Sequence, residues 1–99
     1  MQINKTKDAA KTILTLEGRL DTSTAPKLQE ALISEFESGT HVELDFAGLA
    51  YVSSAGLRVI LMGEKTAKSK GARQTLCNVS DEIMEVFEMT GFADILSIT

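Results

Sequence analysis

Two adjacent serines, Ser53 and Ser54, carry the hydroxyl groups of this chain that are best placed for chemistry. They follow residues 42–46, whose apolar side chains alternate as in a β-strand, and they precede an apolar stretch that predicts a helix over residues 54–68. If that strand is parallel to its neighbours, both serines lie just outside its carboxyl end, where open α/β sheets bind ligands. The first turn of a helix has unpaired N–H groups and a dipole that favours negative charge. A serine at this position therefore either caps the helix or accepts a phosphate.

Serine hydrolase chemistry would need a histidine beside the nucleophile. The residues Ser54-Ala55-Gly56 match the second half of the G-x-S-x-G turn of hydrolases, but Val52 stands where the first glycine belongs. The one histidine, His41, begins the predicted strand, so roughly 16 Å of strand, at ~3.3 Å per residue, separates it from the serines. We therefore expect no Ser–His mechanism and no enzyme.

The sequence also gives little support for a metal site or a nucleotide site. Cys77 and His41 lack the clustered ligand partners of a zinc site. Asp21 and Asp45 are both predicted to end strands at the edge of the sheet that holds Ser54. They form either a Mg²⁺ pair or, the interpretation we favour, two side chains that accept hydrogen bonds from nearby backbone N–H groups. Glycine loops that bind phosphates are absent, and we expect no cofactor and no metal.

The composition is that of one folded domain spanning residues 1–99, with 43% hydrophobic residues. The net charge of −4, without a run of Lys and Arg, argues against binding to nucleic acid. The single cysteine cannot form an internal disulfide, which suits a reducing compartment. No segment is apolar and long enough for a membrane span, and residues 1–5 lack the apolar core of a secretion signal. We expect a cytoplasmic protein that does not bind membranes.

Strands and helices alternate along the chain, which is typical of an α/β fold with a mostly parallel sheet. Strands are predicted over residues 3–7, 11–16, 42–46, 74–78 and 95–98. The first two form an antiparallel hairpin, and residues 17–19 are predicted as a break. Helices are predicted from the capping residues 22–24 to Gly39, over 54–68, and from Ser80 to Gly91.

The helix over 54–68 has more apolar residues than one buried face requires. The stripe that would face the sheet consists of Leu57, Ile60 and Leu61. Val59 and Met62 remain outside that stripe. Either a neighbouring helix covers these two side chains, or they contact a partner.

Ser53 and Ser54 also allow two interpretations. In the first, Ser53 is the N-cap and Ser54 a first-turn residue, and both are structural. In the second, Ser54 carries a phosphate of about −1.5 to −2 charges, which the helix N-terminus tolerates. A partner docked over Val59 and Met62 would then face an unpaired charge, at a cost of about 3–5 kcal/mol, or roughly 100- to 1,000-fold in affinity.

Several motifs resemble the STAS domain and, more narrowly, the bacterial anti-sigma factor antagonists. In chain order they are G-R-L-D at 18–21, T-A-P-x-L at 24–28, L-D-F at 44–46, Y-V-S-S-A-G-L at 51–57, N-V-S at 78–80 and V-F-E-M-T-G-F at 86–92. The likeness covers nearly the whole chain. It implies a four- to five-stranded, mostly parallel sheet with helices packed mainly on one side.

The resemblance also implies a regulator of transcription that works by partner switching. Such an antagonist binds an anti-sigma factor that is also a serine kinase and thereby frees the sigma factor. The kinase phosphorylates a serine at the start of the second helix and is released, and a PP2C-type serine phosphatase resets the cycle. Matched to the family motif D-S-S/T-G-L, the phosphorylated position falls on Ser54, and Asp21 matches the acidic residue beside the site.

Two positions depart from the phosphorylated members: Ser53 stands where they have Asp, and Ala55 replaces a hydroxyl residue. The loss of that Asp removes one carboxylate from the kinase contact. The resemblance and the apolar surplus together predict a partner-binding surface made of Asp21, Ser53, Ser54, Gly56, Val59 and Met62. The alternative is a STAS-type sensor or scaffold subunit that is never phosphorylated and binds a small ligand or anion at the same edge.

Overall fold

The structure is a computed structural model that describes residues 1–99. Its elements, in chain order, are β1 (Gln2–Lys7), β2 (Lys11–Leu20), α1 (Ala25–Glu37), β3 (His41–Val52), α2 (Ser54–Ser69), β4 (Gln74–Cys77), α3 (Asp81–Thr90), the 3-10 turn η1 (Phe92–Asp94) and β5 (Ser97–Ile98). The five strands lie in the sheet in the order of the chain. β1 is antiparallel to β2 and every other neighbouring pair is parallel, which confirms the predicted hairpin and the mostly parallel sheet.

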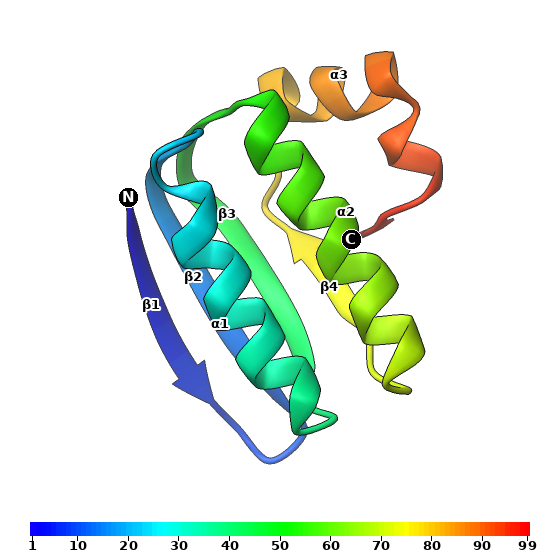
Figure 1. The fold of residues 1–99 in the computed structure, drawn as a ribbon. Helices are drawn as coiled ribbons and strands as arrows, with labels where there is room; N and C mark the ends of the chain where they lie inside the picture. Colours follow the sequence, from blue (N-terminus) through cyan, green and yellow to red (C-terminus); the bar gives the residue numbers. More distant parts are fainter.

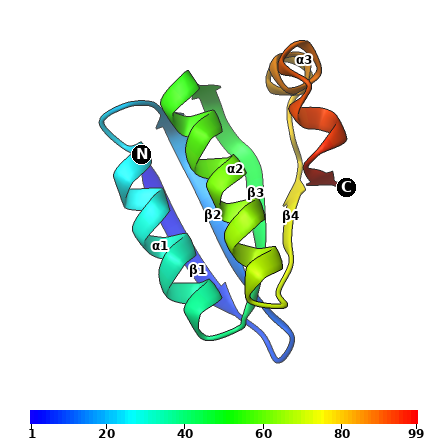
Figure 2. The same cartoon turned by 45° about the vertical axis from the view of Figure 1, so that its right-hand side comes forward.

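The helices α1 and α2 lie side by side on one face of the sheet, and α3 lies apart from them beyond the carboxyl end of β4 (Figures 1 and 2). α3 contacts the sheet through Phe87, whose ring centre is 6.2 Å from that of Phe46 on β3. None of the helices combines the length and apolar character needed to cross a membrane. The layer of α1 and α2 confirms that the helices pack mainly on one side.

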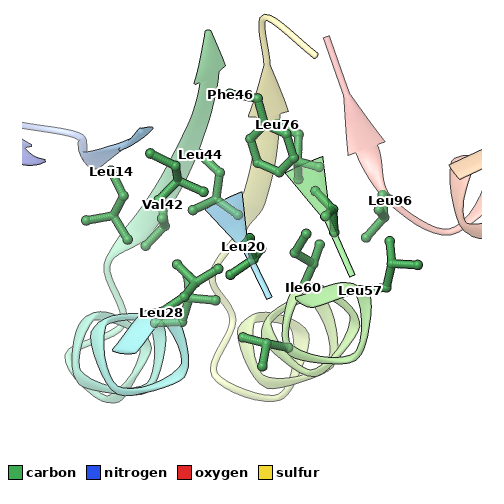
Figure 3. Close-up of a cluster of buried hydrophobic side chains, with 14 of the residues drawn as sticks. Leu14, Leu20, Leu28, Val42, Leu44, Phe46, Leu57, Ile60, Leu76 and Leu96 are labelled. Carbon is green, nitrogen blue, oxygen red and sulfur yellow. The ribbon is translucent and has the colours of Figure 1, made fainter. Parts of the chain in front are cut away.

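The core forms where the apolar stripes of the helices meet the inward side chains of the strands. α1 buries Ala25, Leu28, Leu32 and Phe36, whose spacing places them on one helical face. Figure 3 shows Phe46 of β3 beside Leu76, Leu44 beside Val42, and Leu28 and Ile60 on the helices below them. Each fully buried Leu or Phe stabilises the fold by about 1.5–3 kcal/mol relative to an exposed position.

The central strand β3 is longer than predicted, because it continues past Phe46 to Val52. β2 also continues to Leu20, and the two strands remain paired through register shifts on either side of Glu17 and Gly18. Gly18 has a φ of +99°, which glycine adopts with little strain. The predicted break at 17–19 is therefore wrong: these residues form a bulged continuation of β2.

The carboxyl-terminal third follows its local signals closely. The Ser80 hydroxyl accepts a hydrogen bond from the N–H of Ile83 at 3.2 Å and caps α3 as predicted. Gly91 ends α3 with a φ of +80°, the left-handed stop expected of a glycine there. β5 is shorter than the predicted 95–98, because only Ser97 and Ile98 pair with β4.

Candidate functional site

The longer strands bring Ser53 and Ser54 to the far end of β2 and β3. Leu20 pairs with Val52 across the two strands, and the N–H of Ser53 donates to the Leu20 carbonyl at 2.8 Å. The Ser53 hydroxyl accepts a hydrogen bond from the N–H of Gly56 at 3.2 Å, so Ser53 is the N-cap of α2. Its side chain therefore has the structural role that the capping interpretation predicted.

Ser54 differs from its neighbour in exposure and in hydrogen bonding. It is the first residue of α2 and is exposed, while Ser53 is half-buried. The hydroxyl of Ser54 takes part in none of the side-chain hydrogen bonds that hold this region together, whereas that of Ser53 is bonded to Gly56. Ser54 is thus the serine of the pair whose oxygen is free for another molecule.

Asp21 follows the end of β2 as Ser53 follows the end of β3, and the last residues of the two strands, Leu20 and Val52, are paired. Its Oδ1 accepts hydrogen bonds from the Ser23 hydroxyl at 2.7 Å and from the N–H groups of Ser23 at 3.0 Å and Thr24 at 3.2 Å. The Ser23 hydroxyl, followed by these backbone donors, lowers the pKa of Asp21 below its usual value. Asp21 therefore stays negatively charged at neutral pH while it holds the loop that leads into α1.

Arg19 and Tyr51 add a cation and an aromatic ring to the same place. They are paired residues on β2 and β3, and the guanidinium carbon of Arg19 lies 4.2 Å from the centre of the Tyr51 ring. Tyr51 is 41% exposed, which is unusual for a large hydrophobic residue in this chain. We call the group Arg19, Asp21, Tyr51, Ser53 and Ser54 the serine rim.

Arg19 and Tyr51 are functional candidates that sequence reasoning missed. Both belong to the motifs G-R-L-D and Y-V-S-S-A-G-L, so the signal was present in the chain. The bulge in β2 hid it, because a break at residues 17–19 removes Arg19 from the strand that would place it beside Tyr51.

Gly56, which was predicted to belong to the partner-binding surface, is buried and offers no exposed surface to a partner. A Cβ at this position would lie 2.7 Å from Cγ of Leu20 and 3.1 Å from its carbonyl oxygen. The absence of a side chain lets the first turn of α2 approach the end of β2. Gly56 thus positions the serines and does not present a contact itself.

Val59 is buried as well, with 7% of its surface exposed, so it is not an exposed partner contact as one of the two alternatives had it. One helical turn later, Gly63 lies so close to α1 that a Cβ there would be 3.0 Å from Leu32. Since residues four apart share a helix face, Val59 lies on the inward side of α2, which packs against both α1 and β4. Met62 packs against the core but remains half-exposed, and its sulfur accepts a hydrogen bond from Thr66 at 3.3 Å.

Of the two interpretations of Asp21 and Asp45, the Mg²⁺ pair is wrong, because Asp45 lies within β3 and not at its end. It is seven residues before Val52, or roughly 23 Å at ~3.3 Å per residue. Its Oδ1 accepts hydrogen bonds from the N–H of Ala47 at 2.9 Å and from Asn78 at 3.0 Å, as the hydrogen-bonding interpretation predicted. The structure contains no group of three or more His, Cys, Asp or Glu side chains placed to hold a metal ion.

His41 and Cys77 also lie away from the serines. His41 begins β3 at the opposite end of the strand, and its Nδ1 accepts a hydrogen bond from the N–H of Arg73 at 3.0 Å. Burial is the main cause that raises the pKa of the Cys77 thiol to about 11. Neither side chain can activate Ser54, and Cys77 is a neutral thiol at physiological pH.

Residues 1–99 match the STAS domain family, and the chain belongs to that family. Within it, the chain is a member of the bacterial anti-sigma factor antagonist group. It is 33% identical to the anti-sigma-B factor antagonist of Listeria monocytogenes over 82 residues, which cover 82% of this chain and 72% of that protein. It is 31% identical to the anti-sigma-B factor antagonist of Bacillus subtilis over 84 residues, covering 85% and 77% of the two chains.

The fold is also that of a solved anti-sigma factor antagonist, SpoIIAA of Bacillus. The unphosphorylated form superposes with a TM-score of 0.78 and the phosphorylated form with 0.77, each at 17% identity. These superpositions cover 99% of this chain and 87% and 91% of the respective SpoIIAA chains. At that identity the likeness shows the shared fold alone.

Proposed function

We propose that this protein is a non-enzymatic anti-sigma factor antagonist that acts in the cytoplasm and is switched off by phosphorylation of Ser54. The observation that carries the proposal is the difference between the two serines: the Ser53 hydroxyl caps α2, while the Ser54 hydroxyl is exposed and unbonded. Two further facts support it. The chain belongs to the antagonist family, and SpoIIAA, which has the same fold, exists in a phosphorylated form.

Phosphorylation at Ser54 is compatible with the fold. A phosphate there adds about −1.5 to −2 charges at the amino end of α2, where the helix dipole favours negative charge. Phosphorylation at Ser53 would instead remove the cap, because its hydroxyl oxygen is the acceptor for Gly56. A kinase therefore modifies Ser54 without unfolding the first turn.

The partner surface we propose is the serine rim together with the half-exposed side chain of Met62. The partner is an anti-sigma factor that is also a serine kinase, and its binding releases a sigma factor. Because Val59 is buried, the apolar part of the contact comes from the exposed Tyr51 ring and Met62. Asp21 and Arg19 provide the charged part of the surface.

The phosphate acts by its charge within this contact. The Asp21 carboxylate already faces the Arg19 guanidinium, with Oδ2 4.0 Å from Nε, so the added phosphate would be buried without a counter-charge of its own when the partner docks. An unpaired buried charge costs about 3–5 kcal/mol, which corresponds to roughly 100- to 1,000-fold in affinity. The kinase thus releases its own product, and a PP2C-type serine phosphatase restores the binding form.

The proposal is tested by incubating the protein with its anti-sigma factor kinase and ATP and measuring the intact mass. We expect one added phosphate on the wild type and on Ser53→Ala, and none on Ser54→Ala. An unmodified wild type, or a phosphate retained on Ser54→Ala, would contradict the switch. In titration calorimetry, Ser54→Asp should bind the kinase more weakly than Ser54→Ala, and equal binding would argue against release by charge.

The alternative function requires a small ligand to bind at the serine rim, but the structure has no cavity there. The two cavities of the structure are lined by residues at the other end of the sheet and include neither Ser53 nor Ser54. We therefore favour a protein partner for this surface.

A further inference from the structure

The outer side of α2 continues the proposed partner surface beyond the serine rim. The residues that α2 buries, among them Val59 and Gly63, lie on its inward side. The opposite side presents exposed or half-exposed side chains at helical spacing, and Figures 1 and 2 show no other element over it. We call this side the α2 stripe; it includes Ser54, Arg58, Met62 and Lys65.

Arg58 is a cation of the α2 stripe that the fold itself does not use. It is exposed, and none of the five salt bridges of the structure includes it. The other arginine near the serines, Arg19, is already engaged, because it lies over the Tyr51 ring and faces Asp21. Arg58 is therefore the guanidinium in this region that is free to bind another group.

Arg58 lies one helical turn after Ser54, on the same side of α2. Residues four apart on a helix have Cβ atoms about 5–6 Å from each other. Side chains of a helix lean toward its amino end, so the side chain of Arg58 extends back toward Ser54. A guanidinium at that distance can bind a phosphate through two parallel hydrogen bonds. Lys65 lies eleven residues after Ser54, or roughly 16 Å at ~1.5 Å per residue, and is out of reach.

Arg58 also limits the kind of partner that fits the α2 stripe. It lies one turn from Ser54 on one side and one turn from Met62 on the other, so a partner that covers both residues also covers Arg58. Burial of a guanidinium without an acceptor would cost much of the binding energy. A partner of matching chemistry therefore presents a carboxylate at this position.

We propose that Arg58 exchanges one anion for another when the protein is phosphorylated. In the unmodified protein it binds a carboxylate of the anti-sigma factor kinase, and in the phosphorylated protein it binds the phosphate on Ser54. This inference rests on the proposed function and names a residue through which the phosphate acts. The phosphate carries about −1.5 to −2 charges, so one guanidinium cannot neutralise both it and the carboxylate. Docking then leaves one of the two anions without a counter-charge, and the kinase is released.

The pair of Arg58 and phosphate is tested without a kinase, on protein assembled with phosphoserine at position 54. The second pKa of the phosphate, about 6 in isolation, is measured by a ³¹P NMR titration. Because a nearby cation favours the doubly charged form, this pKa should be lower with Arg58 present than in Arg58→Gln, by about 0.3 or more. Lys65→Gln, which removes an equal charge out of reach of the phosphate, should not change it. High salt should reduce the difference.

The contact of Arg58 with the partner is tested on the unmodified protein by titration calorimetry with the anti-sigma factor kinase. Arg58→Gln should bind about tenfold more weakly or worse, as the loss of a hydrogen-bonded charge pair predicts. Lys65→Gln should stay within about twofold of the wild type. The melting temperature of Arg58→Gln should match that of the wild type within about 3 °C, because Arg58 is exposed and makes no contact that the fold needs.

Three results would overturn the inference. They are an equal phosphate pKa with and without Arg58, equal kinase binding by unmodified Arg58→Gln and wild type, and an equal loss of binding in Lys65→Gln, which would assign the effect to net charge. Failure of the kinase to phosphorylate Ser54 would overturn the proposed function instead. It would leave the phosphate titration unchanged, so the two failures are distinguishable.

Discussion

Replacement of Ser53 by alanine separates the two serines by their energetic roles. The substitution removes the acceptor of the 3.2 Å hydrogen bond from the Gly56 N–H and leaves that donor unpaired at the start of α2. Loss of a serine N-cap costs about 1 kcal/mol of stability, within a range of about 0.5–2. In a domain of this size that lowers the melting temperature by roughly 4–8 °C.

The matched control is Ser54→Ala, one residue further along. Because the Ser54 side chain is exposed and unbonded, its truncation should change the free energy of unfolding by less than about 0.5 kcal/mol. Urea unfolding followed by circular dichroism measures both variants against the wild type. Ser53→Asp provides a third arm, since an Asp caps a helix as well as a Ser and should restore stability.

The assignment of roles fails if Ser54→Ala is destabilised as much as Ser53→Ala. It also fails if Ser53→Ala is as stable as the wild type, because the cap would then contribute nothing. In either case the two hydroxyls would be equivalent, and the reason for phosphorylation at Ser54 in preference to Ser53 would be lost.

Three further predictions concern buried residues that support the fold around the site. Gly56→Ala should lower the free energy of unfolding by about 1–3 kcal/mol, since its Cβ would overpack the end of β2; a stabilised variant would contradict that close approach. Val59→Glu should unfold the protein at a much lower temperature than the wild type, because it buries an unpaired charge; a change below about 1 kcal/mol would place Val59 on the surface. Glu35→Gln should cost about 1.5–3 kcal/mol at pH 7. Bonds from Lys5 and Thr12 lower the pKa of Glu35, so this contribution is present above its usual pKa and disappears as the pH falls through the lowered value. If the difference in free energy of unfolding between the wild type and Glu35→Gln does not decrease at acidic pH, this prediction is wrong.

Glu35 also shows how the edge of the sheet is attached to the helical layer. It is 4% exposed, and it accepts hydrogen bonds from Lys5 at 2.7 Å and from Thr12 at 2.6 Å. These contacts join α1 to β1 and β2. This buried acid has both a counter-charge and hydrogen-bond donors, so it stabilises the fold.

Local signals in the chain were sufficient for much of the fold and for part of the site. Pro26 near the start of α1, the cap at Ser80 and the stop at Gly91 each act through their own backbone neighbours, so they are readable from residue type and spacing. The same holds for Ser53, whose capping bond spans three residues. The alternation of strands and helices likewise predicted the parallel sheet, because crossovers of this length leave few other arrangements.

The remaining features depend on contacts between residues far apart in the chain. Because β2 and β3 stay paired through a bulge, the serine rim lies well past Asp45, and Arg19 lies against the Tyr51 ring. A bulge interrupts the alternation of apolar and polar residues by which a strand is recognised in a sequence. Packing of α2 against the rest of the fold buried Val59, which no periodicity within α2 could show. The same packing buries one oxygen each of Glu64 on α2 and Gln74 on β4 without a hydrogen-bond partner. Sequence patterns reflect interactions between residues that are close in the chain. Side-chain burial and strand pairing depend instead on contacts between distant segments in the core.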